Sequence, residues 1–489
     1  MALERKFVND CEGKFKVALK ETKDGGKTQA WLLWGDHVRV VQTSGTFANV
    51  KARATEGWVP RSVLADEGLL ELYVIDVGQG DGVLMRTPDD RWHVIDAGVE
   101  NDAQMTKKGM ANFIRWKFLD DLGKQKVRLH NVILSHPDFD HYGGLIDLFQ
   151  GKVQRPDREF VVEVEHFYHS GMGRFKNQPK LGKTKNGTVP EPPFDEYGVN
   201  GTDTFITELL AGKNTFKTPA RPLDDTFARF ADLVGKVPTT VQRLGHHDEY
   251  LPEYGEDEEV TIRVLGPIVE QVNGTSGLRV FDSESVTRNG HSIVLRVEYG
   301  KARILLTGDL NTAAQRLLLS YHPLEEFSVD VAKGCHHGSD DIDLRFVRAM
   351  KSRVTVISSG DNEDYAHPRP RVLGASARYG REAKGVKGDL LPPLLYSTEL
   401  ARSVRLAFAG KVREANTPGS EIDAGNAEIK AATRGAAFEP LDEIPISTDL
   451  VYGLINIRTD GDRMLCAYME EQGKDFDVKA FKAGVEPSL

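Results

Sequence analysis

Four potential metal ligands fall within six residues of this chain, in the run His136-Pro-Asp-Phe-Asp-His141. A short apolar segment, 132–134, comes directly before the run and predicts a buried strand. The residues 142–144 follow as a turn that leads into a helix. Imidazole and carboxylate groups at the end of a strand are the donors that a divalent cation requires. A solvated turn that caps the helix is the alternative, but four potential ligands at this spacing favour a metal site.

The composition limits the class of protein. The chain has 489 residues, enough for one large domain and one or two small ones. Its formal net charge of −10 excludes a general attraction to nucleic acid, so contact with DNA would need a local basic patch. The three cysteines, Cys11, Cys335 and Cys466, are far apart, which indicates a reducing compartment. Because neither a signal-peptide pattern nor a membrane-spanning apolar run is present, we expect a soluble, cytoplasmic protein with no membrane contact.

Residues from about 27 to 66 form a pattern of short strands and tight turns. The Gly-Asp-x-Val-x-Val entry at Gly35 and the Gly-Trp-Val-Pro-Arg exit at Gly57 resemble a Src-homology-3-like barrel, and we assign residues 1–66 to it. The resemblance implies that Trp58 binds a peptide, and the alternative is that it fills the small core. The barrel is the natural docking element for a protein partner.

Strand patterns begin again at Leu69, and we expect one large domain over residues 67–400. Within it, residues from about 151 to 260 mix basic residues with Pro and Gly turns, which we interpret as an insertion. Residues 401–447 are rich in Ala, Gly and Glu and are predicted to be a flexible insertion. Residues 448–489 return to a strand pattern and would close the large domain with two strands and a tail.

Further His and Asp residues stand at the ends of other apolar runs. Asp309 ends one run, the pair His336 and His337 follows another, and His367 follows a third, while His291 precedes a fourth. Each alone is a weak sign, because a lone His is more often a hydrogen-bonded structural residue. Their recurrence at successive strand ends predicts that these side chains meet at one edge of a sheet.

An ordered set of motifs resembles the metallo-β-lactamase fold, and in particular the branch that contains the hydrolase domain of the competence DNA-uptake protein ComEC. The motifs are Asp76-Val-Gly-Gln-Gly-Asp81, Val94-Ile-Asp-Ala-Gly98, Ser135 to Gly144, Leu306-Thr-Gly-Asp309, His336-His-Gly-Ser339 and His367-Pro368. The resemblance implies an α/β chain folded as an αββα sandwich, with metal ions at the shared edge of the two sheets.

The resemblance also implies a ligand set for two divalent ions. One ion would be held by His136, Asp138, His291 and Asp309, and the other by Asp140, His141, Asp309 and His336. Asp96 and Asp81 would hold the metal-ligating side chains in position by hydrogen bonds. His337 is the alternative ligand to His336, because Cys335 replaces the usual Pro. Asp140 would orient the attacking water and His367 would face the developing oxyanion. Two imidazoles and two carboxylates at each ion suit Zn²⁺ or Mn²⁺.

The implied chemistry is hydrolysis by a hydroxide that bridges two ions. We expect a phosphodiesterase acting on DNA, with a basic stretch along the phosphate backbone: Arg174, Lys176, Lys180, Lys183 and Lys185. The acidic net charge and the bulky insertion instead favour a hydrolase of a small phosphoester, nucleotide, lactone or lactam. A non-catalytic metal-binding scaffold is the third alternative, and it would be expected to lack several ligands.

Soluble members of this branch are associated with bacterial phage-defence operons that also encode proteases. A cytosolic nuclease needs restraint. We therefore expect an autoinhibited defence effector, in which the insertion at 401–447 or at 151–260 blocks the site until a partner or a protease relieves it.

Overall fold

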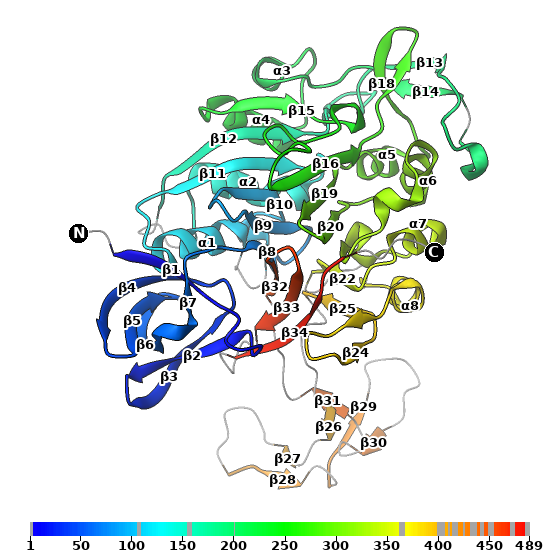
Figure 1. Cartoon of the computed structure of the whole chain (residues 1–489). Coiled ribbons are helices and arrows are strands. Elements are labelled where there is room, and N and C mark those ends of the chain that lie inside the picture. The colour runs from blue at the N-terminus through cyan, green and yellow to red at the C-terminus, as the bar shows by residue number, and fades with distance from the viewer. Residues whose placement is uncertain are drawn as a thin grey trace.

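The computed structural model describes residues 3–104, 109–153, 159–199, 201–360, 367–398, 406–408, 411–412, 419–423, 426–430, 438–440, 445–447, 454–469 and 475–484. An N-terminal unit lies beside a sandwich of two large sheets (Figure 1). Within the described part of the chain, no helix has both the length and the apolar character needed to cross a bilayer.

The N-terminal unit is a seven-stranded sheet in the order β3-β2-β6-β5-β4-β1-β7. Its strands are β1 (Glu4–Val8), β2 (Lys16–Thr22), β3 (Gly25–Leu33), β4 (His37–Ser44), β5 (Phe47–Ala52), β6 (Thr55–Pro60) and β7 (Leu64–Ala65). The last strand ends at Ala65, and both the boundary at residue 66 and the likeness to a Src-homology-3 barrel stay predictions. Asp36 fixes the unit to the sandwich, because its carboxylate accepts a 2.7 Å hydrogen bond from buried Arg458.

The first sheet of the sandwich has nine strands in the order β15-β12-β11-β10-β9-β8-β32-β33-β34. They are β8 (Leu70–Val74), β9 (Gly82–Arg86), β10 (Trp92–Ala97), β11 (Val127–Leu134), β12 (Val162–His169), β15 (Thr240–Arg243), β32 (Ile455–Thr459), β33 (Arg463–Met469) and β34 (Phe476–Lys482). The strands from β10 to β15 run parallel, so that their carboxyl ends meet at one edge.

The second sheet has the order β16-β19-β20-β21-β22-β25. Its strands are β16 (Val260–Gly266), β19 (Val294–Tyr299), β20 (Ala302–Leu306), β21 (Val331–Lys333), β22 (Val354–Ile357) and β25 (Leu394–Ser397). Burial of apolar side chains between the sheets forms the central core, in which Ile95 and Ile133 of the first sheet share a cluster with Leu295 of the second.

Helices cover the outer face of each sheet. On the first sheet these are α1 (Met110–Arg115), α2 (Phe139–Gln150) and α4 (Asp225–Lys236), and on the second α6 (Thr312–Tyr321), α7 (Leu344–Met350) and α8 (Pro370–Tyr379). Two shorter helices, α3 (Lys213–Lys217) and α5 (Glu284–Gly290), lie between strands in the sequence. The predicted αββα sandwich is confirmed.

The predicted insertion at 151–260 is narrower than expected. Strands β12 and β15 belong to the nine-stranded sheet and α4 covers it, because their apolar side chains complete that sheet's core. The chain between β12 and α4 does leave the sandwich. Part of it joins a small sheet of β13 (Thr184–Thr188), β14 (Thr202–Ile206), β17 (Glu270–Val272) and β18 (Thr275–Arg279).

Most of the predicted insertion at 401–447 lies outside the described residues. Its described parts pair as β26 (Leu406–Phe408) with β31 (Pro445–Ser447), β27 (Lys411–Val412) with β28 (Ile422–Asp423), and β29 (Glu428–Lys430) with β30 (Phe438–Pro440). Ahead of it, β23 (Ala383–Lys384) pairs with β24 (Leu390–Leu391). In the closing segment, β32 and β33 fall where two strands were predicted, and β34 is a third strand that the sequence pattern did not indicate.

Candidate metal centre

The His136–His141 motif joins the end of β11 to the start of α2. Asp138 occupies the N-cap position of α2 but makes no side-chain cap bond, so the helix-capping alternative does not account for its carboxylate. Asp140 and His141 lie in the first turn of the helix. The helix lies close against β10 because Gly144 has no side chain: a Cβ atom there would stand 2.1 Å from the carbonyl oxygen of Ala97.

Asp309, three residues beyond the end of β20, is the centre of the buried cluster. Its Oδ2 atom lies 3.2 Å from Nε2 of His141 and 2.9 Å from Nε2 of His337. Four overlapping groups of potential ligand atoms result, and two of them lie in front of the Nε2 atoms: His136 with His141 and Asp309, and Asp140 with His141 and His337. The other two include Asp81: Asp81 with Asp96 and His141, and Asp81 with Asp309 and His337. The side chains therefore converge from the ends of three strands onto one point.

The donor atoms of this cluster fit divalent cations. Nε2 of His136 and Oδ1 of Asp309 are buried and have no hydrogen-bond partner, and the buried Nε2 atoms of His141 and His337 face carboxylate oxygen atoms in ion pairs. Buried polar atoms in folded proteins nearly always have a partner, and a metal ion between imidazole and carboxylate would provide it. Separations of 2.9 and 3.2 Å between nitrogen and oxygen atoms are of the order expected for two ligands of one ion, with bonds of about 2.0–2.2 Å.

Asp96 contacts the second ring nitrogen of His141, Nδ1. The Nδ1 atom of His141 lies 2.9 Å from Oδ2 of Asp96, and Asp96 also accepts hydrogen bonds from the backbone N–H and the hydroxyl of Ser135. Asp96 has a positive φ of 54° at a bulge in β10, which turns its carboxylate toward the site. This contact agrees with the predicted supporting role, because such a carboxylate fixes the orientation of a metal-ligating imidazole.

Asp81 supports His337 in the same manner. Nδ1 of His337 lies 3.2 Å from Oδ1 of Asp81 and 3.1 Å from the carbonyl oxygen of Ser358. Asp81 also pairs with the buried Lys333. The loop before Asp81 requires glycine, because at Gly80, with φ of 92°, a Cβ atom would stand 1.6 Å from the carbonyl oxygen of Asp140.

Burial and neighbouring charges shift the pKa values of these groups in opposite directions. Burial, with the nearby His141, lowers the pKa of His136 to about 3. Burial opposes ionisation of Asp309, but His337 and His141 outweigh it and hold its pKa well below the ordinary range. Burial also disfavours the charged forms of His141 and His337, yet Asp309 outweighs it and raises both pKa values. Positive charge is therefore favoured at Asp309, which is where a cation would sit.

Three predicted ligands are not brought into these groups. Nε2 of His291 donates a 2.6 Å hydrogen bond to the carbonyl oxygen of Arg279, and its ring stacks on Phe281 at 4.9 Å. Asp138 is held by Arg174 and Arg288 instead. His336 is partly exposed, with Nε2 3.8 Å from Oδ2 of Asp309.

Of the two histidines, the structure therefore brings His337, the alternative, and not the preferred His336, into the groups of ligand atoms. Both residues have positive φ angles, of 47° and 52°, and this backbone turn, which the sequence does not reveal, directs His337 into the buried cluster.

His367 lies beside this pair. Its ring centroid is 5.9 Å from that of His336 and 6.5 Å from that of His337. The residues 361–366, which precede it, lie outside the described part of the chain. The contact of His367 with substrate stays a prediction.

A pocket of about 500 Å³ adjoins Asp138 and is lined by part of the predicted basic stretch. Arg174, Lys176 and Lys180 line it. Lys183, just before β13, and Lys185, in β13, are exposed and are not among the lining residues. Cationic residues from other segments, Arg229 and Arg288, complete the lining. Carboxylates also line the pocket: Glu100, Asp224 and Asp225.

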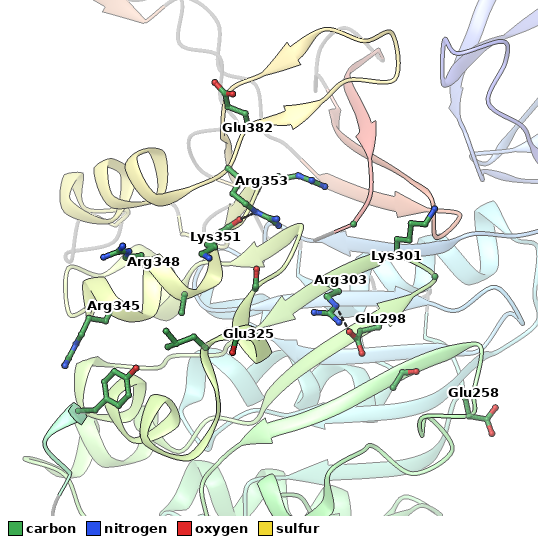
Figure 2. A pocket seen from close by; sticks show the side chains of 18 of the residues that line it. Glu258, Glu298, Lys301, Arg303, Glu325, Arg345, Arg348, Lys351, Arg353 and Glu382 are labelled. Atoms are coloured by element: carbon green, nitrogen blue, oxygen red, sulfur yellow. Dashed lines mark hydrogen bonds and ion pairs between the residues drawn. The ribbon is translucent and has the colours of Figure 1, made fainter. Parts of the chain in front are cut away.

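A larger cavity, of about 1620 Å³, lies at the amino ends of the parallel strands of the second sheet (Figure 2). Lys301 and Arg303 at the start of β20 and Arg353 just before β22 contribute to its lining. The candidate metal ligands follow the opposite ends of these parallel strands. The cavity is therefore not part of the candidate metal centre.

Sequence reasoning missed four residues of the site. Lys333 ends β21, and its ammonium group lies 3.8 Å from Oδ1 of Asp309. Ser135 and Ser292 place hydroxyl groups 3.0 and 3.3 Å from Nδ1 of His136. Arg288 reaches Asp138 across 150 residues of sequence. A lysine at the end of an apolar strand and serines beside histidines are the signals that were present.

Comparisons with known proteins agree with this architecture. The model of the Metallo-beta-lactamase superfamily matches residues 75–219. ComE operon protein 3 of Bacillus subtilis (strain 168) is 29% identical over 136 residues, which cover 25% of this chain and 17% of that protein. Competence protein ComA of Neisseria gonorrhoeae is 34% identical over 104 residues, covering 21% and 15%. The chain thus spans less than a fifth of the length of either relative.

Among solved structures, a protein of unknown function from Enterococcus faecalis V583 is 10% identical, with a TM-score of 0.25 and coverage of 57% of this chain and 56% of that chain.

Proposed function

We propose, for a chain that carries a metallo-β-lactamase domain, that the protein is a metal-dependent phosphodiesterase that cleaves DNA. The broader assignment, to a hydrolase of the Metallo-beta-lactamase superfamily, rests on the family match over residues 75–219. The DNA substrate rests on the two competence-protein relatives and on the cation-lined pocket beside the cluster.

Divalent ions, when bound, would activate water for attack and neutralise charge on the phosphate. The residues that would hold them are His136, Asp140, His141, Asp309 and His337, because their ligand atoms lie close together in two of the groups around Asp309 and His141. Asp96 faces Nδ1 of His141, and the carbonyl oxygen of Ser358 faces Nδ1 of His337 with Asp81 beside it, which would leave each Nε2 atom available as a ligand.

The pocket residues would bind the substrate. Arg174 and Arg288, which line the pocket, lie 2.8 and 2.7 Å from the same oxygen atom of Asp138, a residue of the His136–His141 motif. Guanidinium groups bind phosphate through paired hydrogen bonds. The proposal depends mainly on one observation: two arginines of a pocket with five cationic side chains contact Asp138, which lies in the same motif as the ligands His136, Asp140 and His141. The five cationic side chains are Arg174, Lys176, Lys180, Arg229 and Arg288.

Asp140 and His367 have proposed roles in the reaction itself. Burial raises the pKa of Asp140, whose carboxylate lies with His141 and His337 in one group of ligand atoms and would orient the attacking water. His367, at the rim, would donate a hydrogen bond to a non-bridging phosphate oxygen.

A small phosphoester or nucleotide is the second candidate substrate. The pocket volume of about 500 Å³ is within the range of small-molecule sites, and three carboxylates among its lining residues would repel an extended polyanion. A lactone or lactam would make less use of the cationic lining.

A cleavage panel separates these substrates. The purified chain is freed of metal, reloaded with Zn²⁺ or Mn²⁺, and offered plasmid, duplex and single-stranded oligonucleotides, nucleotides, a generic phosphodiester and a lactam. We expect nicked or linear DNA from the parent and none from an Asp140→Ala/His141→Ala variant purified in parallel. Turnover of the small phosphoesters without DNA cleavage would instead support the second candidate. Full metal loading without turnover of any substrate would favour the scaffold.

We also propose that the enzyme is restrained as part of bacterial antiviral defence in the cytoplasm and is released by a protein partner or a protease. The candidate restraints are residues 401–447 and the chain between β12 and α4. Limited proteolysis of either segment should raise DNA cleavage by the metal-loaded protein. Unchanged cleavage after complete cutting would contradict the restraint and leave the phosphodiesterase proposal intact.

A further inference from the structure

A second group of potential ligands lies in the first sheet, away from the candidate metal centre. It consists of His130 on β11, His166 on β12 and Glu253 in the turn after η6 (His246–Asp248). Each residue offers a ligand atom within 4.8 Å of the other two. Because His130 precedes His136 by six positions of mostly extended chain, the two groups are separated by a distance on the order of 20 Å.

The ligand atoms have the spacing of a zinc site. Nε2 of His130 lies 3.4 Å from Oε2 of Glu253, and Nε2 of His166 lies 3.6 Å from Oε1. Two neighbouring ligands of a tetrahedral ion with bonds of about 2.0–2.1 Å are roughly 3.3 Å apart. The Nε2 atom of His130 is buried and has no hydrogen-bond partner, so an ion at this point would complete its contacts.

Both imidazoles are already oriented for ligation by their other nitrogen atoms. Nδ1 of His130 lies 2.7 Å from Oε2 of Glu165, and Nδ1 of His166 lies 2.7 Å from the hydroxyl oxygen of Thr240. An oxygen atom behind Nδ1 fixes the tautomer and directs Nε2 toward a metal. This arrangement repeats, on other residues, the support that Asp96 gives to His141.

Glu253 is held in place by its own turn. Leu251 and Tyr254 are buried on either side of it, and the hydroxyl group of Tyr254 lies 3.0 Å from Nε2 of His93. Arg91 lies 2.8 Å from Oε2 of Glu253, but this ion pair is exposed and such pairs contribute little. Arg91 has a second carboxylate partner in Asp89, at 2.9 Å, so a cation can replace it at Glu253.

We propose that His130, His166 and Glu253 bind one Zn²⁺ ion, with the fourth position left to solvent. Two imidazoles and one carboxylate suit Zn²⁺ better than Mg²⁺ or Ca²⁺, which prefer all-oxygen shells. The ion would fasten the turn that carries Glu253 to strands β11 and β12. It is therefore a stabilising site, separate from the chemistry at Asp309.

The test measures zinc stoichiometry and thermal stability of the metal-free full chain. His166→Asn and Glu253→Gln change partly exposed side chains and should leave the fold intact, and His247→Asn changes an exposed histidine outside the group. We expect each of the first two variants to bind one Zn²⁺ fewer per chain than the parent, with roughly tenfold or more weaker binding at this site and a smaller zinc-induced rise in Tm. His247→Asn should behave as the parent does.

The same measurements in a His141→Ala/Asp309→Asn background distinguish the two sites. One Zn²⁺ that is retained there, and lost on adding Glu253→Gln, would support the proposal. Zinc binding and a Tm response that are unchanged by both His166→Asn and Glu253→Gln would overturn it. So would the loss of all zinc in the background alone. None of these outcomes depends on the proposed nuclease activity.

Discussion

The Nε2 atom of His337 lies 2.9 Å from the Oδ2 atom of Asp309, and this contact joins the segments that follow two neighbouring parallel strands. Because β20 and β21 run side by side in the same direction, the residues beyond their carboxyl ends reach the same point. The contact places a carboxylate from one strand end within the ligand distance of an imidazole from the next. It also makes His337, rather than His336, the histidine of the buried cluster.

The first prediction compares these two histidines. We expect His337→Ala to lower kcat/KM by roughly a hundredfold or more and to reduce the bound metal, since loss of a ligand should cost at least as much as loss of its supporting partner. His336→Ala should cost less than roughly tenfold and leave the metal content near that of the parent. Elemental analysis with cleavage kinetics checks both. An equal loss of metal in the two variants would contradict the assignment.

The second prediction concerns the buried Lys333. Its ammonium group pairs with Asp81 and lies 3.8 Å from Asp309, so Lys333→Met would remove the buried ammonium group from Asp81 and reduce the positive charge near Asp309. We expect the metal-free variant to lose about 3–5 kcal/mol of unfolding free energy, and the loss to shrink with metal bound, because bound ions would neutralise Asp309.

Urea unfolding in EDTA and in Zn²⁺ measures this difference. Lys301→Met, on an exposed side chain, is the matched control and should stay within about 0.5 kcal/mol of the parent. A loss of the same size in both conditions would show that bound metal does not compensate for Lys333.

The third prediction tests the cationic pocket as a DNA site. Lys180 is an exposed side chain that lines the pocket, and Lys301 lines the cavity at the opposite edge of the second sheet. If Lys180 contacts a backbone phosphate, Lys180→Gln should reduce the slope of log K against log salt concentration by about 0.9 for duplex DNA. Lys301→Gln should leave it unchanged. Fluorescence anisotropy at several salt concentrations gives the slopes, and equal slopes for parent and Lys180→Gln would remove this residue from the interface.

The fourth prediction uses a histidine that is buried as the neutral form. Burial, followed by the neighbouring His130, lowers the pKa of His93 well below its ordinary value of 6.5. In the unfolded chain His93 takes up a proton below about pH 6.5, and in the folded chain it does not. Stability is therefore lost as the pH falls, by about 1 kcal/mol between pH 6.5 and 5.5 for this one group.

Replacement by Gln isolates that contribution. The unfolding free energy of His93→Gln should fall less steeply than that of the parent over this pH range, by about 1 kcal/mol. His247→Gln, which changes an exposed histidine, should retain the slope of the parent. Measurements by urea unfolding in EDTA keep metal binding from adding its own pH dependence. Parallel curves for parent and His93→Gln would disprove the assignment.

The sequence predicted the sandwich well because its strands carry strong local signals. Apolar runs such as 132–134 and 304–306 are buried strands, and the His and Asp residues that follow them do lie at one edge. The boundary of the insertion was placed poorly, because β12 and β15 have mixed sequences whose membership of a sheet depends on their neighbours.

For the candidate site too, local sequence predicted some features and others depended on the tertiary structure. The motif His136–His141 and the position of Asp309 could be identified from residue type and spacing alone, because chemistry and local order suffice for that. Four features could be seen only in the folded chain. His337 contacts Asp309, Asp138 pairs with two arginines, His291 donates a hydrogen bond to a carbonyl oxygen, and Lys333 pairs with Asp81. Local sequence determines which side chains stand at a strand end. Backbone dihedral angles and partners from distant segments decide where each side chain points, and those are set only when the two sheets pack together.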